Sequence, residues 1–211
     1  LPSVDHHVVG ARADAARVEA LLDGEGVVVS GLNAPEQTNI SGPFEAVERV
    51  VERAQAQGLS VTRLKVSHAF HSPLVAPAVP VLRAHLESES FLPLCRDVAS
   101  TVTGAVLPPQ EDLKELLGRQ VLQPVRFFEA LRAAAGIDLL IEVGPGRTLS
   151  GLASPMVPIP VMALDSGGAS LAGLLKAIGA CHALGATIDH GAVFADRFTR
   201  PFDLEHRPKF F

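Results

Sequence analysis

The sequence predicts an α/β protein built in two parts, and two observations support this prediction. Over the first 67 residues, short β-branched runs alternate with two amphipathic segments in the order βαββαβ. Further along, residues 138–143 (DLLIEV) form an apolar run that is typical of a strand inside a parallel sheet. With 211 residues, 47% of them hydrophobic, the chain is long and apolar enough to bury a core.

The first part is expected to be a small sheet with two helices on one face. Pro43 stands at the favoured first position of the longer helix, and Gly58 ends it. The second and third strands are close enough in sequence to pair as a hairpin. The order is that of the ferredoxin-like split unit. The predicted strands are 6–10, 26–33, 37–41 and 60–66, and the helices are 13–23 and 43–58.

The second part alternates helices and strands. Ser72 is expected to cap a helix with Pro73 in its first turn, and Pro77 and Pro80 to delay that helix or make it irregular. From Ala186 onward the chain is expected to be a linker. The remaining predicted helices are 111–121, 125–135, 147–152 and 171–184, and the strands are 98–102, 138–143 and 157–164.

Composition and charge exclude several classes of function. The net charge is −5 and no basic stripe occurs, so nucleic acid and anionic membranes are not expected partners. No apolar run approaches the roughly 20 residues of a membrane span, and the first residues do not form a signal peptide. Two cysteines exclude a disulfide framework, so a cytoplasmic location is expected. The first residue is not Met and the end is an extended Pro-containing tail, so we expect a fragment.

Two histidines stand where a strand is expected to give way to a helix, in the string VSHAFHSPL. Loops beyond strand ends are where α/β folds place catalytic groups, and a histidine there can act as general base. An arbitrary histidine more often simply caps or packs, so from the residues alone that reading stays open for one or both of His68 and His71. Their spacing could also suit a metal, but no third ligand of the right type is clustered with them, so no metal site is expected.

A nucleophile is not evident in the chain. Ser30, Ser41, Ser154 and Ser166 all lack the GxSxG context of a nucleophile elbow, and both cysteines look structural. The segment 144–146 (GPG) is expected to be a tight turn, although a helix start after it could bind an anion. By spacing alone, the sequence therefore contains a candidate base and no nucleophile.

Four strings, taken together, are much more specific than any one motif. Their order and spacing resemble the acyltransferase domains of type I polyketide synthases and the free malonyl-CoA:acyl-carrier-protein transacylases. The resemblance runs from about His6 to Leu184. The strings are NAPEQTNISG (33–42), VSHAFHSPL (66–74), GRQVLQPVRF (118–127) and IEVGPGRTL (141–149).

The resemblance implies a large α/β-hydrolase-like subdomain that is interrupted by a small ferredoxin-like one. Accordingly, residues 1–67 are expected to form the small subdomain, residues 68–185 the C-terminal part of the large one, and residues 186–211 a linker. The family's GHSxG elbow, its glutamine-containing oxyanion motif and the arginine that pairs with the malonyl carboxylate are absent here. In the family order all three precede residue 1, and the tail resembles iterative synthases, including the enediyne type.

The resemblance also implies roles for four residues. The family's catalytic histidine corresponds to His71, and Gln120 corresponds to a position lining the site beside it, where a main-chain carbonyl holds the imidazole in its working tautomer. His68 and Phe70 would shape the wall beside the substrate's α-carbon. Because HAFH stands where methylmalonyl-using relatives carry YASH, malonyl is the expected acyl group. A methyl group in an apolar pocket is worth roughly 1–3 kcal/mol of discrimination.

The activity so implied is transfer of a malonyl extender unit from malonyl-CoA, through an acyl-serine, to the phosphopantetheine thiol of an acyl carrier protein in polyketide biosynthesis. No metal or bound cofactor is expected. The N-terminal half of the domain and neighbouring synthase domains are the expected protein partners, and the present chain alone is expected to be inactive. The alternative is a non-catalytic carrier-protein docking or scaffold module of the same fold. Thioesterase or lipase activity is disfavoured by the missing serine.

Overall fold

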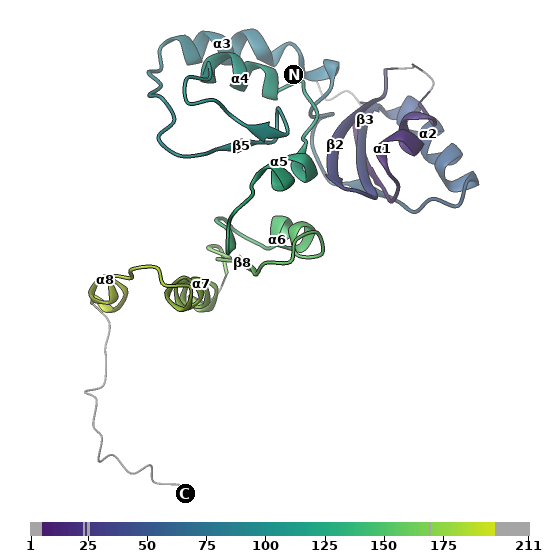
Figure 1. Cartoon of the computed structure of the whole chain (residues 1–211). Coiled ribbons are helices and arrows are strands. Elements are labelled where there is room, and N and C mark those ends of the chain that lie inside the picture. The colour runs from purple at the N-terminus through teal and green to yellow at the C-terminus, as the bar shows by residue number, and fades with distance from the viewer. Residues whose placement is uncertain (1–5, 23, 25, 169, 197–211) are drawn as a thin grey trace, which may run out of the picture. The chain divides into compact units, whose positions relative to one another are not determined.

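A computed structural model describes residues 6–22, 24, 26–168 and 170–196 (Figure 1). It is an α/β structure that divides into two compact units. Unit 1 consists of residues 1–137 and 151–158, and unit 2 of residues 138–150 and 159–211. No helix in the described part of the chain combines the length and apolar character needed to cross a membrane.

The first elements of unit 1 follow the βαββαβ order that the sequence predicts. The four strands form one antiparallel sheet in the order β2-β3-β1-β4. Figure 1 shows its curved strands with α1 and α2 beside them. The elements are β1 (His6–Ala11), α1 (Ala15–Glu19), β2 (Val28–Ala34), β3 (Gln37–Pro43), α2 (Phe44–Ala56) and β4 (Val61–Leu64).

The core of unit 1 lies between this sheet and the apolar face of α2. Val47, Val50 and Val51 recur at helical spacing on that face and are at most 2% exposed. They pack against sheet residues that include Val9 and Ile40. Burying each such side chain contributes about 1.5–3 kcal/mol to the free energy of folding. The three valines therefore fix this face of α2 against the sheet.

The first helix is shorter than the sequence predicts. The expected range 13–23 narrows to Ala15–Glu19, with the carboxylate of Asp14 accepting from the Arg17 N–H at 2.8 Å as N-cap. Leu21 and Leu22 continue the apolar pattern, but their N–H groups bond three residues back, to Val18 and Glu19. The apolar pattern therefore continues beyond the end of the α-helix.

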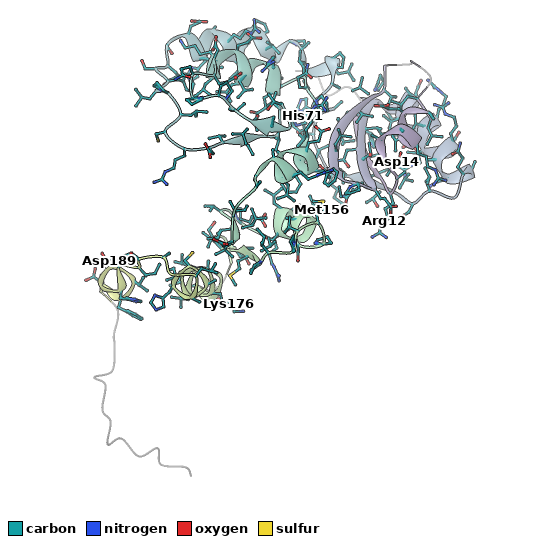
Figure 2. The ribbon with its side chains drawn as sticks, in the orientation of Figure 1. Arg12, Asp14, His71, Met156, Lys176 and Asp189 are labelled. Carbon is teal, nitrogen blue, oxygen red and sulfur yellow. The ribbon has the colours of Figure 1, made fainter. Side chains whose placement is uncertain are left out.

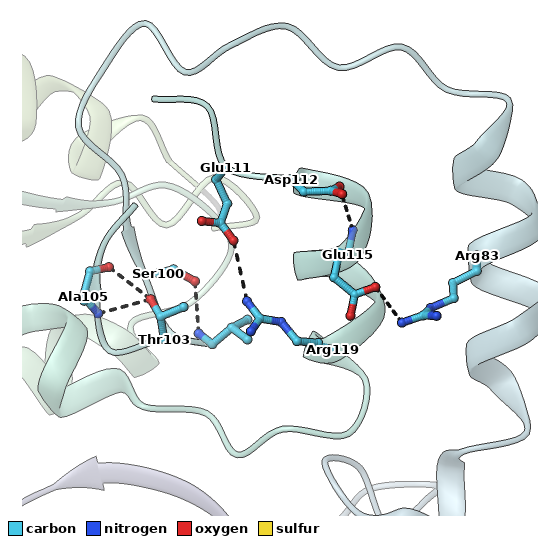
Figure 3. Close-up of polar contacts among 9 residues, drawn as sticks. Arg83, Ser100, Thr103, Ala105, Glu111, Asp112, Glu115 and Arg119 are labelled. Atoms are coloured by element: carbon cyan, nitrogen blue, oxygen red, sulfur yellow. Dashed lines mark hydrogen bonds and ion pairs between the residues drawn. The ribbon is translucent and has the colours of Figure 1, made fainter. Parts of the chain in front are cut away.

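The rest of unit 1 carries the loop and the helices around the two predicted site histidines. Ser72 caps the 3-10 turn η1, with Pro73 as its first residue, and α3 begins only after Pro77, as expected. Helices α3 and α4 are joined by the ion pairs Arg83–Glu115 and Lys114–Glu87; Figure 3 shows the first. The elements are η1 (Pro73–Val75), α3 (Ala78–Glu87), β5 (Ala99–Ser100), β6 (Ala105–Val106), α4 (Leu113–Gln120) and α5 (Phe127–Ala133).

Unit 2 contains a two-stranded parallel sheet and the last helices. Strand β7 is confined to Leu140–Glu142, shorter than the expected 138–143, and pairs with β8 (Val161–Ala163). The Glu142 carboxylate accepts from the N–H groups of Leu149 and Ser150 at the start of α6, which follows the predicted GPG turn in the sequence. The helices are α6 (Thr148–Ala153, shared with unit 1), α7 (Ala172–Ala183) and α8 (His190–Phe194).

Two expectations about this region concern the strand DLLIEV and the segment that begins at residue 186. Val143 is 80% exposed and Ile141 36%, so DLLIEV is not buried on both faces among the described residues. Burial on both faces of a parallel sheet requires layers packed against each face, and among the described residues β7 pairs only with β8. The expected linker from residue 186 contains the short helix α8, capped by the Asp189 side chain; residues 197–211 lie outside the described part.

This open strand leads to a prediction for residues 1–211 produced as an isolated polypeptide. Exposed apolar groups beside an unpaired strand edge favour association, so we expect the product to aggregate, or only residues 6–66 to remain well folded. Sedimentation velocity and scanning calorimetry would measure this. A monomer that melts cooperatively over its whole length would contradict the prediction.

A second prediction concerns the ion pair that joins α2 to β4. The Arg63 guanidinium donates twice to the Glu48 carboxylate, through Nε at 2.9 Å and through Nη2. This hydrogen-bonded cation holds the pKa of Glu48 below its ordinary value of 4.5. The pair therefore stabilises the fold above that pH, and its contribution is lost as the pH falls through the lowered pKa.

Both side chains are partly exposed to solvent, so Glu48→Gln is expected to lower the free energy of unfolding by only about 0.2–1 kcal/mol near neutral pH. Urea denaturation of the complete domain, with and without the substitution, would measure the difference. The difference should shrink as the pH is lowered below 4.5 and the Glu48 carboxylate becomes protonated through its lowered pKa. A difference that grows in acid would refute this account.

Candidate active site

His71 lies on the loop between β4 and η1, in unit 1 (Figure 2). Its backbone has φ of 57°, in the left-handed region that few residues other than glycine adopt. Such conformations cost free energy and persist where the surroundings impose them, often at functional sites. The loop thus places the imidazole at a specific, constrained position.

The imidazole is held by two main-chain carbonyl groups. Its Nδ1 lies 3.1 Å from the Gln120 oxygen and 3.0 Å from the Gln123 oxygen. Because a carbonyl oxygen can only accept, Nδ1 must carry the proton, and in the neutral ring Nε2 is then the free acceptor. This is the tautomer that a general base needs if it is to take a proton through Nε2.

The two carbonyls are available because α4 ends there. Gln120 is the last residue of α4, where helical carbonyls lose their partners within the helix. The N–H groups of Leu122 and Gln123 both bond back to the Arg119 oxygen, which closes the end of the helix. The segment carrying Gln123 is therefore also held by main-chain hydrogen bonds that do not involve the imidazole.

A parallel β-bridge ties that segment to the four-stranded sheet. The Val125 N–H donates to the Ser30 oxygen at 3.0 Å, and the Leu32 N–H donates to the Val125 oxygen at 2.7 Å. These bonds form the isolated bridge between Gly31 and Val125. The edge strand β2 thereby supports the segment that carries one of the two carbonyls.

A largely apolar cavity of about 440 Å³ opens beside His71. All four predicted site residues, His68, Phe70, His71 and Gln120, line it. The ring centroids of His68 and Phe70 lie 5.9 Å apart, and Phe70 is 46% exposed. The structure thus brings the predicted set together. The other lining residues come from η1, α3, α4 and the end of α4: Val75, Ala78, Leu82, Leu117 and Val121.

A second, smaller depression of about 240 Å³ also borders Phe70 and His71. Its polar wall comes from the sheet, through Asn33 on β2 and Asn39 on β3. The sequence interpretation assigns no site role to either asparagine. The pairing of β2 with β3 brings the side-chain amides of Asn33 and Asn39 to the same depression. The short sequence spacing of the two strands could have indicated that these two residues lie close together.

Two further contributors escape sequence reasoning. Gln123 lies in the quoted string GRQVLQPVRF, but only Gln120 is singled out there. Its position before Pro124 is the available signal, because a residue before proline is biased away from helix. The side chain of Ser72, expected only as a helix cap, also bonds to the Ala69 oxygen.

The described residues do not supply an evident nucleophile or metal centre. Ser30 borders the smaller depression but is 4% exposed and lies within a strand, without the exposed strand-to-helix turn of a nucleophile elbow. No group of three or more His, Cys, Asp or Glu side chains within the described ranges is arranged to hold a metal ion.

Comparison with known proteins assigns the chain to a family. Residues 5–154 match the family described as "Acyl transferase domain", and the chain belongs to that family. It is 36% identical over 208 residues to polyketide synthase GfsB of Streptomyces halstedii, covering 93% of this chain and 4% of that protein. It is 38% identical to the malonyl CoA-acyl carrier protein transacylase of Bacillus subtilis, covering 62% of this chain and 42% of that protein.

Solved structures show the same relationship. The acyltransferase domain of the iterative polyketide synthase in enediyne biosynthesis superposes with a TM-score of 0.86 at 42% identity, covering 92% of this chain and 51% of that one. The malonyl CoA-acyl carrier protein transacylase of Clostridium perfringens gives 0.80 at 27%, covering 87% and 60%. The chain thus spans about half the length of the solved acyltransferase domains that it matches.

Proposed function

We propose that this chain is the part of a polyketide synthase acyltransferase domain that supplies the general base and the acyl-group filter for malonyl transfer. The observation that carries the proposal is the His71 imidazole, held through Nδ1 by two carbonyls at the mouth of an apolar cavity. The similarity to malonyl CoA-acyl carrier protein transacylases supports malonyl-CoA as donor and an acyl carrier protein as acceptor.

In the first half-reaction, Nε2 of His71 takes the proton of a serine hydroxyl from the remainder of the domain. The serine oxygen attacks the malonyl thioester carbonyl, the carbon–sulfur bond breaks, and coenzyme A leaves with the proton from Nε2. An acyl-serine results. The two carbonyls that accept from Nδ1 hold the ring in place. They also stabilise the imidazolium that exists between proton uptake from the serine and proton release to coenzyme A, which is the role of the third member of a triad.

In the second half-reaction, the same base acts on a different nucleophile. The phosphopantetheine thiol of the carrier protein gives its proton to Nε2 and attacks the acyl-serine. The ester bond breaks, a new thioester forms, and the serine oxygen recovers the proton from Nε2. His71 is thus needed twice in each cycle, and the proposed reaction uses no metal or bound cofactor.

The proposal assigns the architecture as well. Residues 1–67 would be the ferredoxin-like subdomain, a reading supported by the strand order β2-β3-β1-β4, and residues 68–185 the C-terminal part of an α/β-hydrolase-like subdomain. Residues 186–211 would connect to a neighbouring synthase domain. The open edge of β7 is where we expect the N-terminal half of the domain to add its strands.

The test is the mass of the acyl-enzyme. We expect the complete acyltransferase domain, incubated with malonyl-CoA, to gain one malonyl group, which then passes to an added phosphopantetheinylated carrier protein. Intact-protein mass spectrometry measures both steps. If no adduct forms while His71 is intact, the proposal is wrong, and the non-catalytic carrier-protein docking module becomes the better account.

A further inference from the structure

The residue after the proposed base is unusually constrained for a serine. Ser72 is completely buried, and its hydroxyl makes two hydrogen bonds. It donates to the Ala69 oxygen at 2.6 Å and accepts from the Leu74 N–H at 3.3 Å. Ala69 is also completely buried, so no solvent is available to replace the serine at its carbonyl.

The two hydrogen bonds of the Ser72 hydroxyl restrict the backbone on which His71 lies. The bond from Ser72 to Ala69 closes a four-residue loop, with Phe70 and His71 between its ends. The bond from Leu74 fixes the same hydroxyl from the following side, where the Val75 N–H also donates to the Ser72 main-chain oxygen at 3.2 Å. A short loop closed on both sides leaves the intervening backbone few alternatives.

The enclosed residue is the one that needs this constraint. His71 has φ of 57°, a conformation that a free histidine populates only to a small extent. Its Cα–Cβ direction, and with it the distance from Nδ1 to the Gln120 and Gln123 oxygens, follows from that backbone conformation. A return to an ordinary negative φ would swing the side chain away from both carbonyls.

We infer that Ser72 is a positioning residue, whose buried hydroxyl keeps His71 in the left-handed conformation and so selects the Nδ1–H tautomer. The inference rests on the proposed role of His71 as base. It goes beyond a helix-capping role, because a cap explains the bond from Leu74 but not the bond to Ala69. In enzymes, a shift of about 1 Å in a reacting group can reduce the rate by as much as 10²-fold.

The test compares Ser72→Ala with Ser72→Thr in the complete acyltransferase domain, a unit that relatives show to be stable enough to crystallise by itself. Ala removes the hydroxyl, whereas Thr keeps it. We expect Ser72→Ala to lower kcat for malonyl transfer by about 10- to 100-fold with KM changed less than about twofold. Ser72→Thr should recover most of that loss.

Nitrogen NMR of the histidine-labelled domain supplies a readout that a purely structural role would not change. The wild-type protein should show His71 protonated on Nδ1. Ser72→Ala should show a mixture of Nδ1–H and Nε2–H forms, and Ser72→Thr should resemble the wild type. If Ser72→Ala fails to fold, Ser72→Cys, which keeps the volume with a much weaker donor, takes its place.

Ser88→Ala is the matched control. Its hydroxyl also donates to a carbonyl three residues back, that of His85 at 2.7 Å, but it lies on the exposed end of α3. It should leave kcat and the His71 tautomer unchanged. The inference is overturned if Ser72→Ala keeps the Nδ1–H form, or if kcat falls equally in the Thr variant. A wild-type domain that forms no malonyl adduct refutes the proposed function instead, while the tautomer comparison still decides the role of Ser72.

Discussion

Replacing His71 with Ala in the complete domain is expected to lower kcat/KM for malonyl transfer by about 10²–10⁴-fold. The His71 imidazole is placed to take a proton through Nε2, because Nδ1 is bound to two carbonyls. In the proposed mechanism, neither the serine nor the thiol is activated without this imidazole. Transfer of labelled malonyl from malonyl-CoA to a carrier protein, followed by gel or mass readout, would measure the loss.

His85→Ala provides the control for this substitution. His85 is an exposed histidine on α3 that faces Glu89 at 3.9 Å and does not line either depression. Its removal should leave transfer within twofold of the wild type, whereas the His71 variant should keep the wild-type melting temperature and lose activity. A His71 variant that still transfers malonyl at more than about a tenth of the normal rate would show that another group is the base.

Phe70→Ala is expected to relax the choice of acyl group rather than abolish transfer. Phe70 lines both depressions beside His71, and its ring is partly exposed within the cavity. We propose that this flat ring fills the space that a methyl group on the substrate's α-carbon would need. The preference for malonyl-CoA over methylmalonyl-CoA should therefore fall by about 10-fold or more, since one methyl group is worth roughly 10- to 200-fold.

Competition between the two thioesters for one limiting carrier protein would measure this preference directly. Phe91→Ala is the matched control, because Phe91 is similarly exposed, at 40%, but lies outside both depressions. It should leave the ratio unchanged. Equal use of the two thioesters by the wild-type domain would remove the basis for assigning selectivity to the HAFH motif.

The features that the sequence predicts correctly are local ones. Ser72 and Pro73 start η1 as expected because capping chemistry depends on adjacent residues only. The βαββαβ order follows because each strand and helix carries its own periodic pattern. The helix predicted at 13–23 is too long because the buried Leu21 continues the pattern through three-residue turns, which periodicity does not distinguish from an α-helix.

The features that sequence reasoning misses depend on contacts between distant segments. The Gln123 carbonyl meets His71 across 52 residues of chain, and no side-chain property of glutamine indicates where its main-chain oxygen will point. Likewise, Val143 belongs to an apolar run but is 80% exposed among the described residues, because burial depends on distant segments that the run itself does not specify. The family resemblance placed Gln120 beside the site, where the structure shows its carbonyl at 3.1 Å from Nδ1.

The bridge between Gly31 and Val125 connects the four-stranded sheet to the segment whose carbonyl binds the His71 imidazole. Gln123 is two residues from Val125, and Pro124 lies between them. Because the proline ring fixes its own φ, the Gln123 carbonyl has little conformational freedom relative to the bridge. The position of this carbonyl, and with it the orientation of His71, therefore depends on an edge strand that contributes no side chain to the hydrogen bond.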